Sequence, residues 1–399
     1  MTISHNNRPI RSFASLLFSI TLIAAAFVST LAQDWRTVHD GVEYAEVTRT
    51  IDNQPVRMNL LRLDLKKVRL DVVHAMDAVI GTATVSSMAT RHKAIAAINA
   101  GFFRLDTSVY AGDPAGIFQI DGKLFSEANF GRIALLINNS VKTCDKCKNP
   151  GTRTDVSIAH LKSFAELWSE TRRSNIDGID RQLKDKEIVL YTPEFGGPTP
   201  RSESAITEVI IDANKRIVSV TETNGGTAVP KGGYVLAASG ARRPEVSATA
   251  IKGKEGLVIL GSYIENPTTS NAKMAFTNVE DIVGGVPQLI KDGKIDITWQ
   301  EEKTTKSFVE TRHPRTAVAK LKDGKFLMIA VDGRSESSGG ISLNDLAAYL
   351  LELGATDAMN LDGGGSTTMF LDGKVVNHPS DKEGERKVSD AILVTARKK

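Results

Sequence analysis

The tripeptide Asp-Gly-Lys occurs four times in this chain, each time between runs rich in β-branched, aromatic and other apolar residues. The four copies begin at Asp121, Asp292, Asp323 and Asp372. An Asp-Gly pair adopts the positive φ angles that tight hairpin turns require. Each copy therefore predicts a two-residue hairpin, and four hairpins predict a chain with much antiparallel sheet.

Helices are predicted in three places. Residues 342–353 begin with a Ser N-cap, carry one apolar face and stop at Gly354. Shorter patterns predict a helix over residues 85–93 and an amphipathic helix over residues 161–173. Residues 190–265 look like a series of short strands. We therefore expect an α+β fold: a largely antiparallel or mixed sheet core with hairpins and a few flanking helices.

The first 32 residues resemble an export signal. Arg8 and Arg11 precede an uncharged stretch of 16 residues, 13–28, and Ala32 ends a small-residue cleavage pattern. An N-terminal membrane anchor is the alternative, but 16 residues fall short of the roughly 20 that span a bilayer. We expect cleavage after Ala32, a secreted or periplasmic protein without a stable membrane anchor, and a single domain over 33–399 with a possible insertion or long connection at about 140–185.

The charge balance narrows the kinds of partner. The 399 residues include 50 Lys and Arg against 47 Asp and Glu, and removing the first 32 residues leaves a net charge near +1. A dedicated nucleic-acid binder needs a basic excess to neutralise phosphates, so we expect no nucleic-acid partner. A hydrophobic content of 41% excludes disorder as the main state. Nothing in the composition indicates an oligomeric state.

The two cysteines, Cys144 and Cys147, are separated by two residues in a turn rich in Lys, Asn and Gly. An exported protein favours a local disulfide between them. A redox role would require a βαβ context, and a zinc site would require two further ligands. We therefore expect a disulfide and neither a metal nor another cofactor, although Asp332 and Asp362 together could hold a cation.

The strongest candidate site is a run of glycines after a predicted buried strand, residues 356–361. Asp362 ends this strand and is followed by three glycines and three hydroxyl residues. Glycines let a backbone approach a ligand closely and present N–H groups to an anion. A strand-connecting turn is the alternative, but such turns rarely need three consecutive glycines. The candidate residues here are Asn360, Asp362, Gly363, Gly364, Gly365, Ser366 and Thr367.

Further polar groups lie at the ends of other predicted strands. Two arginines beside a proline suit recognition of a phosphate or carboxylate, although a solvated charged loop has the same composition. An Asn before two phenylalanines and an Asp two residues before an Arg are weaker signals. These candidates are Glu310, Arg312, His313 and Arg315, then Asp332 and Arg334, and finally Asn99, Phe102 and Phe103.

Several enzyme classes lack their motifs in this sequence. It has no Gly-x-Ser-x-Gly elbow, no His-Glu-x-x-His zinc motif and no Gly-x-Gly-x-x-Gly at the start of a βαβ unit. The remaining groups are Asp, Arg, Asn, Gly and hydroxyls. They suit an anionic, hydroxyl-rich substrate such as a sugar phosphate.

These motifs resemble those of the phosphodiester glycosidase family. The resemblance is carried by residues 340–347 and 353–369, with blocks in matching order at 99–103, 190–196, 284–288, 315–318 and 331–334. It extends over roughly residues 90–395. It implies hydrolysis of a sugar-1-phosphodiester of the GlcNAc-1-phosphate type at the glycosidic carbon, which frees the sugar and leaves a phosphomonoester.

The resemblance also implies roles for the candidate residues. Asp362, or else Asp332, would stabilise the oxocarbenium-like centre or activate water, with Glu310 as a further acid or base. Arg315, supported by Arg312 or Arg334, would stabilise the leaving phosphate. The amide and the two aromatic rings at 99–103 would face the sugar. Whether the reaction retains or inverts the anomeric centre depends on the separation of the carboxylates.

Two other functions remain open at this point. The chain could be a non-catalytic protein that binds or helps to export an envelope polysaccharide. It could also be a phosphodiesterase that cleaves the P–O bond. The products released from a GlcNAc-1-phosphodiester would distinguish these functions.

Overall fold

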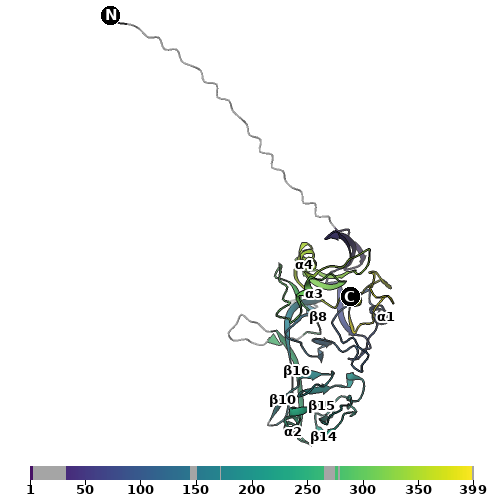
Figure 1. The fold of residues 1–399 in the computed structure, drawn as a ribbon, viewed down its shortest axis with the longest axis vertical. Coiled ribbons are helices and arrows are strands. Elements are labelled where there is room, and N and C mark those ends of the chain that lie inside the picture. Colours follow the sequence, from purple (N-terminus) through teal and green to yellow (C-terminus); the bar gives the residue numbers. More distant parts are fainter. Residues whose placement is uncertain (3–32, 144–150, 171, 265–274, 277–278, 398–399) are drawn as a thin grey trace. The chain divides into compact units, whose positions relative to one another are not determined.

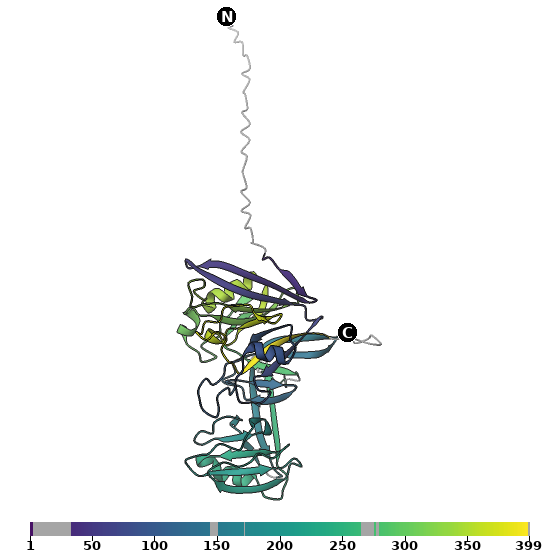
Figure 2. The same cartoon turned by 90° about the vertical axis from the view of Figure 1, so that its right-hand side faces the viewer.

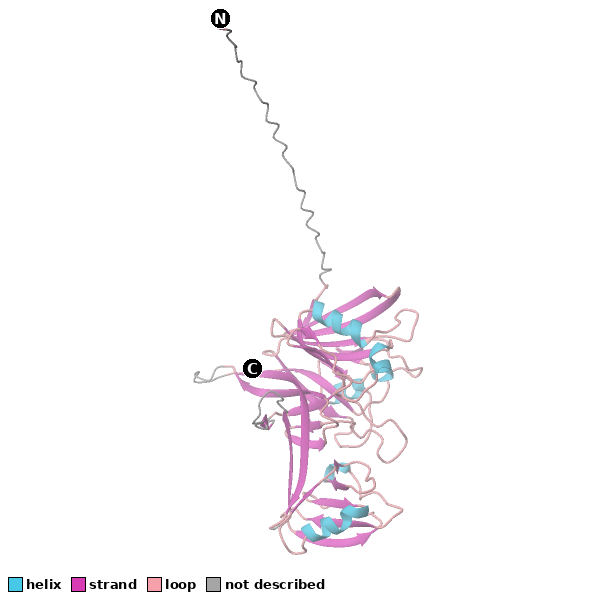
Figure 3. Cartoon of the chain, turned by 60° about the vertical axis from the view of Figure 1, so that its left-hand side comes forward, coloured by secondary structure: helices cyan, strands magenta, loops and turns pink. Residues whose placement is uncertain are grey.

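The chain folds into four β-sheets with few helices (Figures 1 and 3). The computed structural model describes residues 1–2, 33–143, 151–170, 172–264, 275–276 and 279–397. By its contacts the chain divides into Met1–Gln33 and Asp34–Lys399, and the architecture below is that of the second unit. The export signal predicted at 1–32 and the disulfide predicted between Cys144 and Cys147 lie outside the described residues.

The first sheet has eight strands, and Figure 2 shows its long neighbouring strands β2 and β3 in purple. In spatial order they are β1 (Arg36–His39), β2 (Val42–Ile51), β3 (Gln54–Leu63), β22 (Phe326–Val331), β21 (Arg315–Leu321), β23 (Ala355–Asn360), β19 (Gln288–Lys291) and β20 (Lys294–Ile295).

The second sheet is built around a strand of 17 residues, β9. Its order is β17 (Ala275–Phe276), β16 (Leu257–Ile264), β9 (Thr152–Trp168), β8 (Ile133–Lys142), β18 (Asp281–Gly284), β6 (Phe118–Ile120) and β7 (Lys123–Ser126), with β10 (Arg173–Asn175) also paired to β9.

Two five-stranded sheets complete the fold. The third sheet contains β11 (Gly178–Ile179), β12 (Ile188–Tyr191), β15 (Tyr234–Ala238), β13 (Ile206–Ile211) and β14 (Ile217–Thr223). The fourth contains β25 (Lys374–Val375), β24 (Met369–Leu371), β5 (Ala96–Asn99), β26 (Asp390–Ala396) and β4 (Val68–His74).

The helices are short and lie between strands. They are α1 (Val85–Arg91), α2 (Arg243–Thr249), α3 (Lys306–Glu310) and α4 (Leu343–Glu352), with 3-10 turns η1 (Pro193–Phe195), η2 (Gly240–Arg242) and η3 (Gly364–Ser366). The N-cap predicted for α4 is confirmed, because Ser342 Oγ accepts a hydrogen bond from Asp345 N.

The fold is richer in strand than the expected α+β class. Strands take up 46% of the structure and helices 11%, so the predicted antiparallel sheet core is confirmed and the helical share is smaller than a balanced α+β fold requires. Among the described strands the pairings are antiparallel, except that β11 and β12 run parallel.

Three of the four Asp-Gly-Lys copies form the predicted two-residue hairpins, β6–β7, β19–β20 and β24–β25. Asp121, Asp292 and Asp372 each have a φ of 49°, and the glycine that follows each also has a positive φ. The fourth copy forms a longer turn between β21 and β22. There Leu321 N donates to Lys325 O, which leaves three residues in the loop.

The helix predicted over residues 161–173 is wrong, because residues 152–168 form β9. Leu161, Phe164, Ala165 and Trp168 have the spacing of a helical face, but Leu161, Ser163, Ala165 and Leu167 fit strand alternation equally well. Two long partners decide the outcome, since β8 and β16 both pair with β9.

The central strands β21 and β22 of the first sheet are buried on both faces. Alternate residues of β22 point to opposite sides, so Met328 packs in the core shared with the second and fourth sheets while Leu327 and Ile329 pack beneath α4. Leu346 and Leu350 of α4 cover that second side. This burial explains why the sequence of β22 is an unbroken apolar run.

Candidate active site

The ends of several strands meet at one junction between the first and fourth sheets. Strand β21 is antiparallel to both neighbours, so its first residue, Arg315, pairs with Val331 at the end of β22, and Ala317 pairs with Asn360 at the end of β23. The residues that follow β22 and β23 are therefore brought beside the start of β21. In the fourth sheet, Asn99 at the end of β5 pairs with Ala391 near the start of β26.

The glycine run fits tightly into this junction. Gly363 lies against the backbone of β21, since a Cβ built there would be 2.7 Å from Pro314 O. Gly364 has a φ of 59°, and its N–H donates to Pro314 O at 2.8 Å. Ser366 N donates to Gly363 O at 3.1 Å. These three contacts lie within the chain, so the glycines here let the turn pack closely against the backbone that precedes β21.

Asp362 lies at the start of this turn, where hydrogen bonds of its backbone N–H and carbonyl fix its position. Its N–H donates to Ala100 O at 2.9 Å, and its carbonyl accepts from Asn99 Nδ2 at 2.7 Å. The residue stays partly accessible, yet the protein around its carboxylate excludes most water. Burial raises the pKa of Asp362 from 3.8 to about 7, an effect that Ser366 and Arg386 partly offset and the nearby Asp390 reinforces.

Asp332, the other predicted carboxylate, is 2% exposed and follows β22 directly. Its Oδ1 accepts from Asn377 Nδ2 at 3.1 Å and from His378 N at 2.8 Å. Its Oδ2 lies 3.5 Å from His378 Nδ1 and 3.9 Å from Arg57 Nε. Burial raises the pKa of Asp332, against the lowering effect of the hydrogen bond from His378. The carboxylate thus holds the segment after β25 in place.

Arg315 is 2% exposed, and its guanidinium binds backbone carbonyls. Nη2 donates to Phe308 O and Thr311 O at 2.7 and 2.8 Å, and Nε donates to Ile341 O at 3.3 Å. Burial, aided by the charge of Arg334, lowers the pKa of Arg315 to about 10. These contacts tie α3 and the loop before α4 to the start of β21.

Arg312 also makes structural contacts. Its Nε and Nη2 donate to Gly340 O, and its Nη1 donates to Ile51 O at 2.9 Å. Of the predicted phosphate-binding arginines, Arg334 reaches the glycine run with its guanidinium, whereas Arg315 approaches it with its Cδ, 3.7 Å from a Cβ built at Gly363. A Cβ built at Gly364 would lie 3.1 Å from Arg334 Nη2.

A second guanidinium covers the glycine run from the C-terminal segment. Arg386 Nη2 would lie 2.0 Å from a Cβ built at Gly365, so only a glycine leaves it room. Arg386 forms a two-bond ion pair with Asp381, with Nε–Oδ2 and Nη2–Oδ1 distances of 2.7 and 3.0 Å. The sequence analysis missed this pair, because residues 377–390 carry no glycine run or strand-end motif of their own.

Asp390 is another missed residue. It is 1% exposed at the start of β26, and its Oδ1 accepts from Gly101 N at 2.5 Å while its Oδ2 accepts from Ser389 Oγ. Burial raises the pKa of Asp390 to about 6. The carboxylate lines a narrow crevice with Gly101, Phe102 and Arg132. An Asp at the start of an apolar strand was the available signal for it.

The predicted side chains of Asn99, Asn360 and Thr367 contact other groups of the protein rather than open space. Asn99 Oδ1 accepts from Thr316 Oγ1 and Thr368 N at 2.8 and 3.1 Å. Asn360 Nδ2 donates to Val286 O at 2.7 Å. Thr367 Oγ1 lies 3.3 Å from Thr316 Oγ1. These side chains are buried and connect β5, β21 and the glycine turn.

The remaining predicted residues differ in position. Phe102 packs against Phe308, with ring centroids 6.3 Å apart, while Phe103 packs on the core beside α1. His313 is partly buried near Arg315 and Arg334. Burial is the main cause that lowers the pKa of His313, and the positive charges of the two arginines lower it further. Glu310 is exposed at the end of α3 and pairs with Lys306 at 3.4 Å.

Across the described ranges, no group of three or more His, Cys, Asp or Glu side chains is arranged to hold a metal ion. In the same part of the chain, no helix is both long and apolar enough to cross a bilayer.

Solved structures resemble this fold over most of the chain. A protein from Synechocystis matches with a TM-score of 0.74 and 22% identity, over 91% of this chain and 63% of the other. A protein from Burkholderia pseudomallei K96243, described as exported, matches with a TM-score of 0.71 and 25% identity, over 86% of this chain and 74% of the other.

Sequence comparison points to one family. The bovine N-acetylglucosamine-1-phosphodiester alpha-N-acetylglucosaminidase is 31% identical over 196 residues, which are 42% of this chain and 36% of that enzyme. This chain therefore matches about a third of the length of that relative. The phosphodiester glycosidase family model matches residues 207–395, which include Asp332, the glycine run and Arg386. Residues 207–395 thus match the phosphodiester glycosidase family, and the resemblance found in the sequence is confirmed.

Proposed function

We propose that the chain hydrolyses the glycosidic bond of a sugar-1-phosphodiester of the GlcNAc-1-phosphate type. Water would add across the bond between the anomeric carbon and the phosphate oxygen. The sugar would gain the hydroxyl, and the phosphate would leave as a monoester on its other substituent. The observation that carries the proposal is one carboxylate of raised pKa, Asp362, at a glycine turn flanked by the guanidinium groups of Arg334 and Arg386.

Asp362 has the properties of the reacting carboxylate. A pKa of about 7 leaves it divided between its acid and base forms at neutral pH, where acid–base catalysis works best. We assign it the task of accepting a proton from water or stabilising the positive charge that develops at the anomeric carbon. Asp332 would act on the same side of the site by holding the segment that carries Arg386.

The two arginines would stabilise the leaving phosphate. Phosphate needs little protonation in order to leave, so charge stabilisation replaces much of the work of a general acid. The ion pair with Asp381 orients Arg386 through Nε and Nη2 and leaves Nη1 without a protein partner among the described residues. Arg334, in the segment that follows β22, approaches the glycine run at Gly364. We therefore move the phosphate-binding role expected of Arg315 to these two residues.

We further propose that the protein acts outside the cytoplasm on a phosphodiester-linked glycan. The predicted export signal and the similar Burkholderia protein described as exported support this setting. The bovine relative, by its name, acts on an N-acetylglucosamine phosphodiester, which supports the substrate class.

The test is product analysis with the purified chain and a chromogenic GlcNAc-1-phosphodiester in water enriched in ¹⁸O. We expect free GlcNAc, a phosphomonoester on the chromogenic group, and no ¹⁸O in the phosphate, which ³¹P NMR detects. Asp362→Asn should abolish turnover, and Asp292→Asn, an exposed turn variant, should not. GlcNAc-1-phosphate as product, with ¹⁸O in a phosphate group, would contradict the proposal and indicate a phosphodiesterase. Glycan binding without turnover would indicate a binding protein.

A further inference from the structure

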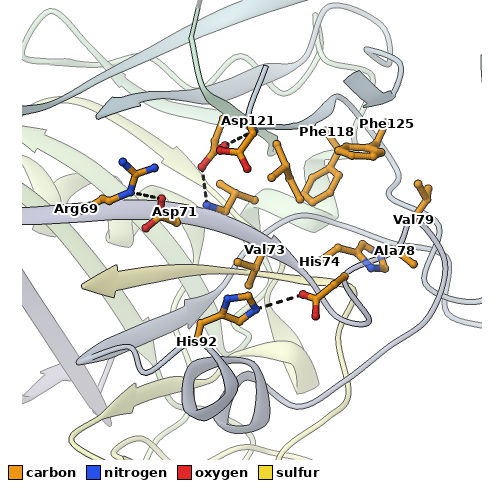
Figure 4. A pocket seen from close by; sticks show the side chains of 14 residues that line it. Arg69, Asp71, Val73, His74, Ala78, Val79, His92, Phe118, Asp121 and Phe125 are labelled. Atoms are coloured by element: carbon orange, nitrogen blue, oxygen red, sulfur yellow. Dashed lines mark hydrogen bonds and ion pairs between the residues drawn. The ribbon is translucent and has the colours of Figure 1, made fainter. Parts of the chain in front are cut away.

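A separate cavity of about 390 Å³ lies on β4 and contains none of the residues assigned above (Figure 4). Its volume falls in the range of small-molecule sites. Strand β4 and the β6–β7 hairpin supply most of its lining, and the loop after β4 closes one side. A preformed cavity of this size needs an explanation that the proposed hydrolysis does not supply.

The interior of this cavity is apolar and aromatic. Phe118 and Phe125 lie side by side, with ring centroids 6.3 Å apart, and Ile120 of the same hairpin extends this wall. His74 meets Phe118 edge to face at 5.9 Å. Burial lowers the pKa of His74 to about 4, so its ring is neutral at physiological pH. This wall favours an apolar or aromatic body.

Carboxylates gather at one end of the same cavity, as Figure 4 shows for Asp71 and Asp121. Asp281 lies behind them, with Oδ2 accepting from Val72 N and Oδ1 accepting from Asp121 N, both at 2.9 Å. Asp121 sits at the exposed hairpin turn. The charges of Asp71 and Asp121 add to burial in raising the pKa of Asp281 to about 6.

The cationic side chains that line the cavity already form ion pairs with protein carboxylates. Arg69 divides its guanidinium between Asp71, at 2.7 Å, and Glu280, at 3.3 Å. At the opposite rim, His92 lies 3.3 Å from Asp77. The described lining holds four carboxylates and one arginine. Just outside it, Arg91 pairs with Asp77 at 3.1 Å, and Lys123, which pairs with Glu194, has its Nζ 5.4 Å from the centroid of the Phe125 ring. The excess of negative charge beside an apolar wall repels anions and attracts cations.

We propose that this cavity binds a small organic cation, an ammonium group carried on an apolar or aromatic body. The ammonium lies between Asp71 and Asp121, where it relieves the repulsion between the carboxylates. The body packs on Phe118 and Phe125. A neutral sugar fits less well, because its hydroxyls need donors and acceptors around the whole ring and the wall here offers neither.

The test uses 2-phenylethylammonium as the probe and the full chain, by isothermal titration calorimetry. We expect it to bind at least tenfold more tightly than 2-phenylethanol, its neutral counterpart, and expect phenylacetate not to bind. The affinity should fall as salt is added, because the attraction is electrostatic. Equal affinity for the amine and the alcohol, or no binding of the amine, would overturn the proposal.

The variant Asp121→Asn tests whether the probe binds at this carboxylate or responds only to the overall charge of the protein. Asn adopts the left-handed turn conformation almost as well as Asp, so the hairpin should persist. We expect the affinity for the probe to fall about two- to fivefold. The matched control is Asp292→Asn, which changes the same turn position, also with a φ of 49°, in the β19–β20 hairpin. A loss of affinity in the control, or none in Asp121→Asn, would refute the assignment.

Discussion

Replacing Gly365 with alanine tests whether Arg386 must lie over the glycine run. The new methyl group would stand 2.0 Å from Arg386 Nη2 and 2.3 Å from Asp381 Oδ1. Atoms in ordinary contact are about 3.5 Å apart, so the ion pair must withdraw by roughly 1.5 Å. Both clashing atoms end flexible side chains, and Gly365 does not have a positive φ. We therefore expect the fold to lose about 1 kcal/mol or less.

The expected effect on catalysis is far larger. A misplacement of about 1 Å in a positioned charge can reduce a rate about 100-fold, and losing one charge-stabilising donor costs about 100- to 1,000-fold. We therefore expect kcat/KM on the GlcNAc-1-phosphodiester to fall about 100-fold in Gly365→Ala. Arg386→Ala should lose at least as much, and the double variant should lose little more, because both changes remove the same interaction.

The measurements are steady-state kinetics and thermal unfolding on the same preparations. Gly197→Ala is the control, since a Cβ there meets nothing within 4 Å, and it should match the wild type in both. Full activity in Gly365→Ala and in Arg386→Ala would refute the role given to Arg386. Additive losses in the double variant would show instead that the two residues act separately.

Three further predictions concern pH, burial and capping. Folding raises the pKa of Asp362 from 3.8 to about 7, so the stability that this residue contributes falls as the pH rises from 4 to 7. The Tm of Asp362→Asn should therefore increase relative to that of the wild type over this range. A Tm difference that does not change with pH would contradict this. Asp332→Ala leaves His378 N without its acceptor and removes one of the two acceptors of Asn377 Nδ2, so it should cost about 1 to 3 kcal/mol in urea unfolding. Ser342→Ala removes the N-cap of α4 and should cost about 1 kcal/mol in the same assay, without changing kcat.

The elements that the sequence predicted well depend on neighbouring residues. An Asp-Gly pair determines its own turn, and three of the four copies are two-residue hairpins. Helix α4 has its N-cap and apolar face within one stretch of the chain. Residues 161–168 show the limit of such reasoning. Their pattern fits a helix and a strand alike, and the pairing with β16, about 100 residues later, selects the strand.

The same division applies to the candidate site. Asp332, Asp362 and the glycine run were identified because each follows an apolar strand within a few residues. The sequence could not separate arginines whose guanidinium group binds backbone carbonyls, such as Arg315, from those whose guanidinium group lies beside the glycine run, such as Arg334.

What the sequence determined by itself is three Asp-Gly hairpin turns, the ends of the strands that border the candidate site and the chemical groups available at them. The tertiary structure alone decided which of those groups meet. Antiparallel pairing of β21 with β22 and β23 brings distant strand ends to one junction, and the contact between Gly365 and Arg386 closes it from the C-terminal segment. The physical reason is that a turn or cap is stabilised by bonds within a few residues, whereas a site is assembled by sheet pairing and burial across hundreds.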